Sequence, residues 1–171
     1  YIMIIEYKMS QRDCVRCSAT TKKGDRCKRR TCKYSDMCHD HTRINKQLQV
    51  KKSAIQGSGQ GLFTTKKIKV GEKIADYGGQ VKTKTQYDAD NTGYGIYFNK
   101  NLVLDGYSTQ HGLGRYANHC RAVNRNKGEC SKNNARFSAN TQQRTASLKA
   151  TTSIPAGSEV FVNYGSGYWS D

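Results

Sequence analysis

The stretch that decides the fold lies in the second half of the chain, at residues 114–120, and reads Gly-Arg-Tyr-Ala-Asn-His-Cys. Asn124 follows five residues after His119, and a second stretch at 157–165, Gly-Ser-Glu-Val-Phe-Val-Asn-Tyr-Gly, ends a short apolar run on Tyr164. An ordinary core does not carry arginine, asparagine and histidine side chains in such density without partners. We therefore interpret both stretches as parts of a binding site.

Length and composition predict one main domain with a small appendage. The chain has 171 residues, of which 35 % are apolar and 25 % charged, with a single proline. Such a chain can bury one core but is too short for two, and it lacks the proline content of a disordered protein. No apolar run reaches about 18 residues, and Glu6 and Lys8 interrupt the apolar residues near the beginning. We expect a compact, loop-rich, soluble chain.

The charge is strongly basic and is concentrated near the beginning of the sequence. Lysine and arginine number 29 against 13 acidic residues, a formal charge of +16, and residues 1–56 alone hold 14 basic and 5 acidic side chains. An excess of this size predicts a polyanionic partner, most often nucleic acid. The alternative is a basic surface that serves solubility alone.

A segment rich in cysteine and histidine lies within this basic part. Almost no large apolar side chain separates its members, so a bound ion has to supply its folding energy. The spacing favours zinc held by four of these residues, with residues 20–24 forming the loop between the first two. The four predicted ligands are Cys17, Cys27, Cys38 and His41.

The remaining members of this segment have no assigned role. Cys14 and Cys32 can replace a named ligand, bind a second ion incompletely or stay as free thiols, while His39 is expected beside the site rather than in it. The chain has seven cysteines, an odd number, and five of them fall in this segment. Metal binding therefore fits better than a disulfide framework, and a reducing, intracellular compartment follows from it.

Beyond a connector at 42–54, with a weak helical or extended pattern, the sequence predicts an all-β domain. Short β-like runs are separated by Gly, Asn, Asp and Ser, and a polar hairpin loop is expected at 139–145. The predicted strands are 62–63, 73–77, 95–98, 102–105, 135–138, 147–152 and 159–164.

Two further pieces precede the central motif. Gly59 and Gly61, in Ser-Gly-Gln-Gly-Leu-Phe, allow the backbone to approach a ligand closely, although such a pair alone more often marks a turn. The second piece is Gly71-Glu72, followed by a run that ends at Tyr77.

In this order and spacing, the four pieces resemble the SET-domain protein lysine methyltransferases over residues 53–169. The family carries Gly-x-Gly, a Gly-Glu turn before a strand ending in Tyr, Arg-Phe-x-Asn-His-Ser-Cys-x-Pro-Asn, and a Gly-x-Glu strand ending in Asp-Tyr. This chain departs from the pattern at four positions, where a different residue replaces the family's serine, cysteine, proline and aspartate. These are Cys120, Arg121, Val123 and Asn163.

The resemblance implies a mainly β fold, the SET β-clip, in which the Asn118 segment threads beneath the final strand in a knot-like arrangement. It also implies that S-adenosylmethionine and the substrate lysine enter from opposite faces and meet at Tyr164. Tyr94 is the second expected active-site tyrosine, with Tyr97 as its competitor. The residues expected to hold the cofactor are Gly59, Gly61, Asn118, His119, Tyr164 and Trp169.

The end of the chain lacks the cysteine-rich zinc tail with which some relatives close the pocket. We expect Trp169 or Tyr168 to fold back on the adenosine or on the lysine channel, or else simply to pack in the core. In relatives, the residue two positions before the final tyrosine influences how many methyl groups are added. Here it is Val162, which does not indicate a product.

The predicted organisation is a zinc-binding module at 12–43 and a SET domain at 53–169. The module looks like small Cys/His modules of viral and some eukaryotic proteins, and the compact SET domain is similar to viral or microbial members, so a large DNA virus is the expected source. The predicted function is S-adenosylmethionine-dependent methylation of lysine in a histone tail or another protein. The basic module would contact DNA or nucleosomes in the nucleus or virion, and pairing into a homodimer is left open.

Two alternatives belong to other classes of protein. One is a zinc-dependent nucleic-acid-binding protein whose SET-like part no longer transfers methyl groups, as the altered Cys120 and Asn163 would suggest. The other is a structural virion protein that uses its charge for genome packing, which leaves the order of the motifs unexplained.

Overall fold

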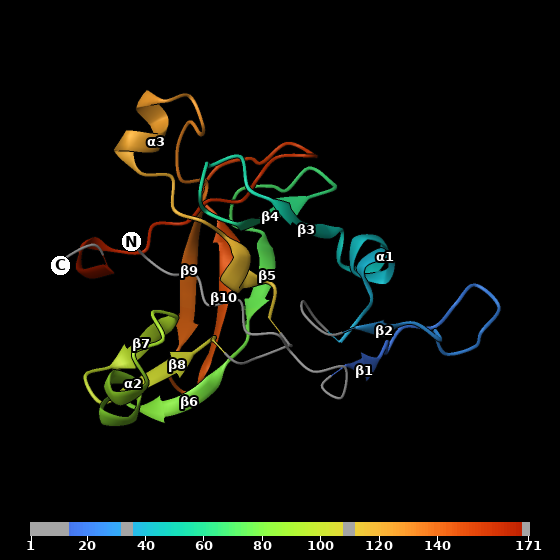
Figure 1. Cartoon of the computed structure of the whole chain (residues 1–171), viewed down its shortest axis with the longest axis horizontal. Helices are drawn as coiled ribbons and strands as arrows, with labels where there is room; N and C mark the ends of the chain where they lie inside the picture. Colours follow the sequence, from blue (N-terminus) through green and yellow to red (C-terminus); the bar gives the residue numbers. More distant parts are fainter. Residues whose placement is uncertain (1–13, 32–35, 108–111, 169–171) are drawn as a thin grey trace.

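The computed structural model describes residues 14–31, 36–107 and 112–168, and it shows a body of short antiparallel sheets with a small module at one side (Figure 1). The module holds β1, β2 and α1, and β3 leads from it into the body. Strand is the main regular secondary structure of the body, as the sequence predicts. Among the described residues, the longest helix is far too short to cross a membrane.

The N-terminal module is built around a two-stranded ribbon and one helical turn. Strand β1 (Val15–Arg16) pairs with β2 (Arg30–Thr31), and the chain between them forms the projecting loop of Figure 1. Helix α1 (His39–His41) continues directly into the π-helical turn η2 (Thr42–Lys46). The predicted connector is therefore partly structured, because β3 follows immediately after Gln47.

Three antiparallel sheets make the body. The first pairs β3 with β4, the second has the order β5-β10-β9, and the third has the order β6-β8-β7. The polar loop predicted at 139–145 joins β9 to β10 as a hairpin. The strands are β3 (Leu48–Lys52), β4 (Gln60–Thr64), β5 (Lys73–Tyr77), β6 (Gln80–Thr83), β7 (Gly95–Asn99), β8 (Leu102–Asp105), β9 (Ala135–Asn140) and β10 (Thr145–Ala150).

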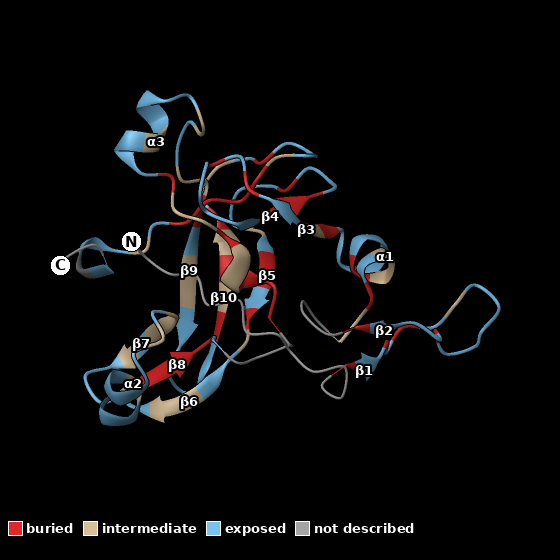
Figure 2. Ribbon diagram, in the orientation of Figure 1, coloured by how far each residue is buried: buried red, intermediate tan, exposed pale blue. Residues whose placement is uncertain are grey.

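The main core lies where the first two sheets meet the C-terminal segment. Its side chains are almost completely excluded from solvent, and Figure 2 shows the buried stretches on β3, β4, β5 and β10. Burial of this apolar surface is the main favourable contribution to the folding free energy. The most enclosed members are Leu62, Ile68, Leu148, Ile154, Val160 and Val162.

The C-terminal segment 159–162 joins three distant parts of the chain. Glu159 bridges to Phe63 in antiparallel fashion, while the next residues make parallel bridges, Phe161 to Asn118 and Val162 to Ala135. The predicted strand at 159–164 is therefore a set of isolated bridges rather than a long ladder. The Asn118 segment thus lies side by side with the final strand, the neighbourhood that the resemblance implies, and Asn118 comes beside Glu159.

Helical segments interrupt the β pattern at four places where no helix is predicted. Helix α2 (Lys84–Asp90) starts with a capping box, in which Thr83 and Gln86 satisfy each other's backbone N–H groups. The other three segments border the cavity described below. They are the turn η3 (Gly114–Tyr116), the helix α3 (Ala122–Asn126) and the turn η4 (Ser166–Tyr168).

Candidate active site and metal centre

A cavity of about 760 Å³ lies where the two signature stretches meet. Its walls come from the loop before β4, the start of β7, η3 with the following loop and α3, and the C-terminal segment. A ligand of cofactor size fits a cavity of this volume. The lining residues form the segments 55–60, 93–96, 114–119 and 123–124, together with Tyr77, Arg121, Phe137, Tyr164 and Tyr168.

Tyr164 lies at the centre of this arrangement. Its hydroxyl donates a hydrogen bond of 2.8 Å to the carbonyl of Ala117, and its ring centroid lies 5.4 Å from that of His119. The hydroxyl is therefore directed at the Asn118 segment and not at bulk solvent. Burial raises the pKa of the phenol well above its ordinary value, so the group is neutral at physiological pH.

Of the two competing tyrosines, the structure places Tyr94 in the cavity wall. The guanidinium of Arg115 lies 4.4 Å from the Tyr94 ring centroid, a cation–π contact that also involves Tyr107 and Tyr116. Tyr97 is half exposed, packs against Tyr87 and is not among the lining residues.

Tyr77 is a third tyrosine of the cavity wall, and it is not among the site residues expected from the sequence. It is 6 % exposed, its hydroxyl donates to the carbonyl of Tyr94 at 2.9 Å, and its ring packs edge-on against Phe137. Burial raises its pKa, so this phenol is also neutral. The sequence signal was present, since Tyr77 ends the strand that follows the Gly-Glu turn.

Asn118 and His119 form the opposite wall. The Asn118 amide donates to the Gln60 carbonyl at 3.0 Å and to Glu159 Oε1 at 3.2 Å, which holds the loop against β4. Burial lowers the pKa of His119, and the nearby positive charges of Arg121 and Arg125 lower it further. The imidazole is therefore predominantly neutral at pH 7.

The two glycines predicted to hold the cofactor have different surroundings. Gly59 lines the cavity and has a φ of +66°, which favours glycine. Gly61 is buried in β4 and is not a lining residue, because it faces the carboxylate of Glu159. Its lack of a side chain thus accommodates Glu159 rather than a ligand.

Glu159 is a buried carboxylate that fixes this side of the cavity. Its Oε1 accepts hydrogen bonds from the Ser53 hydroxyl at 2.7 Å and from Asn118, and its Oε2 accepts one from the Ala54 N–H at 2.8 Å. The residue is 5 % exposed. Its role is to position backbone, because its oxygens are already engaged by protein donors.

Two asparagines near the central motif have different contacts. Asn124, the second asparagine of the motif by spacing, lines the cavity, and its amide donates to Glu129 within a local loop. Asn134 binds the C-terminal segment, since its amide donates to the Glu159 carbonyl and its oxygen accepts the Phe161 N–H, each at 2.9 Å. We call residues 121–132, which lie between Cys120 and Asn133, the excursion.

Of the two aromatic residues expected to fold back, Tyr168 lies beside Tyr164. Its ring is edge-on to that of Tyr164, with centroids 4.7 Å apart, and it lines the cavity. Half of the residue is exposed. The alternative candidate, Trp169, lies outside the described residues.

The four predicted metal ligands come together in the N-terminal module. The ligand atoms of Cys17, Cys27, Cys38 and His41 all lie within 4.8 Å of one another. His41 Nδ1 is 3.5 Å from the Cys17 sulfur and 3.4 Å from the Cys38 sulfur. Three buried thiols and one imidazole at these distances match the donor set and geometry of a structural zinc site.

The described cysteines outside the cluster differ from the sequence-based interpretation. Cys14 is disulfide-bonded, so it is neither a metal ligand nor a free thiol. Cys32 lies outside the described residues, and His39 is an exposed neighbour of the site, as expected, that contacts Asp40. Cys120 and Cys130 form a disulfide, which the preference for metal over bridges did not anticipate.

The cations of the module divide into two groups. The guanidiniums of Arg16, Arg26 and Arg30 donate to backbone carbonyls of the module. Arg29 pairs with Asp40, which raises the pKa of the arginine and lowers that of the carboxyl group. By contrast, Lys22, Lys23 and Lys28 are exposed and take part in no ion pair among the described residues. Lys33, another lysine of this segment, lies outside the described residues.

Comparisons with known proteins agree with this architecture. The family model for the SET domain matches residues 59–165. A chain from the structure of ctPRC2 in complex with H3K27me3 and H3K27M superposes with a TM-score of 0.57 at 22 % identity, over 69 % of this chain and 14 % of that one. The chain thus spans a small part of that protein, and the likeness concerns the fold. No curated protein matches.

Proposed function

Because the chain belongs to the SET-domain family, we propose that it is an S-adenosylmethionine-dependent protein lysine methyltransferase. The observation that carries this proposal is the position of Tyr164, whose hydroxyl binds Ala117 and whose ring lies between His119 and Tyr168 in the cavity. One side of the cavity at Tyr164 is lined by Gly59, Asn118 and His119, and another by tyrosine rings. A neutral phenol where these two surfaces meet suits a reaction in which a methyl donor and an amine meet end to end.

The wall formed by Gly59, Asn118 and His119 is the proposed site of the methyl donor. Gly59 lets backbone approach a ligand, and the Asn118 loop is fixed by Gln60 and Glu159 before any ligand arrives. A neutral His119 adds no repulsion toward a cationic donor. When bound, S-adenosylmethionine supplies a methyl group already activated on a sulfonium, so the protein's main task is alignment.

The wall formed by Tyr77, Tyr94 and Tyr164 is the proposed lysine channel. A lysine must reach the reaction as a neutral amine, and apolar walls disfavour its ammonium form by desolvation. The guanidinium of Arg115 over Tyr94 lowers the amine pKa further through like-charge repulsion. The two phenols with raised pKa values bring hydroxyl groups without introducing negative charge.

Methyl transfer is tested with labelled S-adenosylmethionine and core histones, with the intact chain and its Tyr164→Phe variant. We expect label on histone lysine with the intact chain and strongly reduced label with the variant. Donor binding without transfer to any histone or peptide library would instead favour a binding protein that has lost activity. The altered Cys120 and Asn163 make that the second candidate function.

We further propose that the N-terminal module binds zinc and anchors the enzyme to DNA or nucleosomes. The supporting feature is that Lys22, Lys23 and Lys28 are exposed and form no ion pair with other described residues, so they are available to contact phosphates. Each DNA phosphate that the protein no longer neutralises should reduce the slope of log affinity against log salt by about 0.9.

The anchoring proposal is tested by changing all three lysines to glutamine. We expect weaker nucleosome binding with a salt slope lowered by about 2 to 3, and unchanged methylation of a free peptide. The matched control changes three exposed lysines of the body, Lys67, Lys69 and Lys100, to glutamine. Equal loss of nucleosome binding in both triple variants would show that only net charge matters.

A further inference from the structure

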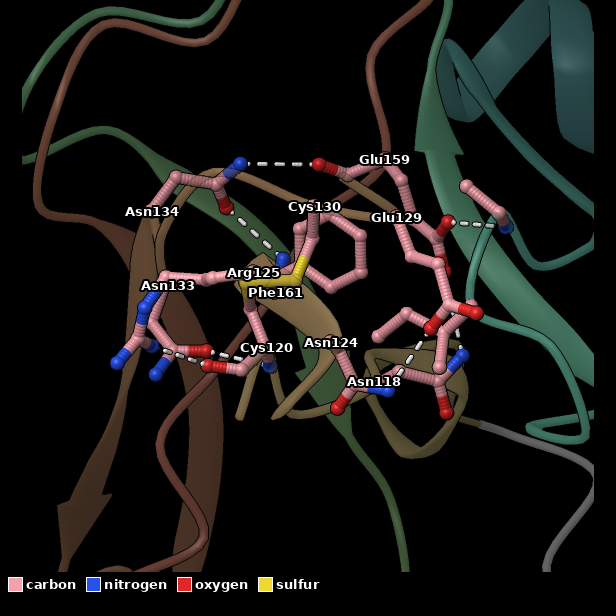
Figure 3. The surroundings of a disulfide bond; sticks show 12 residues. Asn118, Cys120, Asn124, Arg125, Glu129, Cys130, Asn133, Asn134, Glu159 and Phe161 are labelled. Carbon is pink, nitrogen blue, oxygen red and sulfur yellow. Dashed lines mark hydrogen bonds between the residues drawn. A yellow bond between two sulfur atoms is a disulfide. The ribbon is translucent and has the colours of Figure 1, made fainter. Parts of the chain in front are cut away.

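The excursion 121–132 is closed at its base by the disulfide between Cys120 and Cys130 (Figure 3). Cys120 directly follows Asn118 and His119, and it is completely buried. The chain leaves this point, forms α3 and returns to the motif at Asn133. The disulfide therefore joins the start of the excursion, at the proposed donor wall, to its end.

Hydrogen bonds with Arg125 in the excursion and with Asn133 just after it hold both backbone groups of Cys120. The Cys120 N–H donates to Asn133 Oδ1 at 2.8 Å, and the Cys120 carbonyl accepts from Arg125 Nη1 at 2.8 Å. Asn124 donates to Glu129 at 2.9 Å across the loop. Figure 3 shows these groups gathered around the bridge. The position of Cys120, and with it that of His119, thus depends on the closed shape of the excursion.

The same excursion contributes to the cavity. Arg121, Val123 and Asn124 are lining residues, and Val123 is 47 % exposed. On the inner side, the two cysteines pack with Ile55 and Phe161. Ile55 belongs to the loop that contains Gly59, so the disulfide packs against this loop and is continuous in sequence with the Asn118-His119 segment.

We propose that the Cys120–Cys130 disulfide is a redox-sensitive positioning element of the methyl-donor site, an inference that rests on the proposed function. With the bond closed, α3 and the Asn118-His119 segment are held in the shape that forms the cavity. A dithiol reductant breaks the S–S bond, delivers two electrons and two protons to give two cysteine thiols, and is itself oxidised to a disulfide. The opened loop gains conformational freedom that donor binding then has to remove, which weakens binding.

The experiment measures S-adenosylmethionine binding by titration calorimetry with the full chain, purified without reductant. Affinity is compared before reduction, after reduction with dithiothreitol and after reoxidation, with thiol counts and zinc content measured in each state. We expect binding on the order of tenfold weaker after reduction, and recovery after reoxidation. Cys130→Ser should bind with the reduced-state affinity in every condition, whereas Cys14→Ser, which removes the other disulfide-bonded cysteine described, should respond to reductant as the parent does.

Hydrogen exchange provides a second readout that does not depend on activity. Reduction should increase exchange at 118–134 while the buried residues of β4 and β10 remain protected. Equal donor affinity in the oxidised and reduced states would overturn the inference while leaving the proposed function intact. Absence of donor binding in both states of a folded protein would overturn the proposed function itself. If Cys130→Ser does not fold, the reduction and reoxidation of the parent chain decide the question.

Discussion

The carboxylate of Glu159 accepts a hydrogen bond from the amide of Asn118 at 3.2 Å, although 41 residues separate the two in sequence. This contact joins the C-terminal segment to the loop that forms the proposed donor wall. The same carboxylate also accepts hydrogen bonds from the Ser53 hydroxyl and the Ala54 N–H, which connects it to the chain before β4. One buried acid thus holds together three segments that the sequence places far apart.

Replacing this acid with its amide tests the connection. In Glu159→Gln, the NH₂ group faces donors on whichever side it turns, so at least one buried donor loses its acceptor. We expect the free energy of unfolding to fall by about 1 to 3 kcal/mol, measured by urea denaturation. The matched control is Asp76→Asn, an exposed carboxylate paired with Lys73, which should change stability by less than about 0.5 kcal/mol. Similar losses in both variants would remove Glu159 from this role.

Gly61→Ala tests why glycine occupies β4 opposite that carboxylate. A Cβ built at Gly61 would lie 2.1 Å from Glu159 Oε1 and 2.7 Å from its Cδ, so the acid must move. We expect a loss of about 1 to 3 kcal/mol by denaturation. Because the clash is with the Glu159 side chain, Gly61→Ala should reduce the free energy of unfolding less when Glu159 is already replaced by alanine. Strict additivity of the two changes would mean that the glycine is needed for another reason.

The fold could be predicted from sequence largely because its strands carry a clear pattern of turns and apolar runs. Residues 73–77 and 102–105 form strands with the predicted bounds, and the polar hairpin lies where expected. Strand β6 and helix α2 could not be predicted in this way. The helix has no buried residue, so it lacks an apolar stripe, and its local support comes from the Thr83 capping box and the exposed Lys84–Asp88 pair.

For the candidate sites, the sequence predicts the metal ligands better than it predicts the contacts around the cavity. Short-range spacing was sufficient for the metal ligands, because Cys38 and His41 lie on one helical turn. Spacing indicates Asn124 as the second asparagine of the motif, and this residue lines the cavity. The contacts of Asn134 with the C-terminal segment join distant parts of the chain, and spacing alone does not reveal them. The position of Tyr77 at the end of the strand after the Gly-Glu turn is a signal that the sequence does contain. The Cys120–Cys130 bridge joins two residues only ten apart, but the sequence does not show that they pair with each other rather than with a metal.

Tyr164→Phe removes a hydroxyl from the centre of the cavity. The change breaks the hydrogen bond to Ala117 and leaves that carbonyl without this donor, so we expect about 1 kcal/mol lower stability. Methyl transfer should fall by about 10²-fold through kcat, with donor affinity nearly unchanged, because alignment rather than binding is lost. Single-turnover kinetics and calorimetry separate the two effects. Tyr97→Phe, on the half-exposed side of β7, is the control and should retain the parent rate.

His119 should make stability depend on pH below neutrality. Its pKa is lower in the folded chain than in the unfolded chain, since burial and two neighbouring arginines disfavour the imidazolium. The unfolded state therefore binds more protons as pH falls through about 6.5, and the folded state loses stability over that range. Above this pH both states are neutral and the contribution vanishes. In His119→Gln, this component should disappear from unfolding free energies measured between pH 5 and 8, while identical pH slopes in both proteins would contradict the assignment.

Cys27→Ser tests the metal centre by removing one of its four ligands. Cys27 is buried in the module, and its sulfur is one of the four ligand atoms that lie within 4.8 Å of one another. We expect the intact chain to contain about one zinc ion per molecule by mass spectrometry of the metal, and the variant to retain much less after dialysis. The module should then become sensitive to proteolysis, because little apolar burial remains to hold it. The control is His39→Gln, an exposed histidine of the same module that lies outside the cluster, and it should keep its zinc. Loss of the metal from both variants would mean that the ligand set is different.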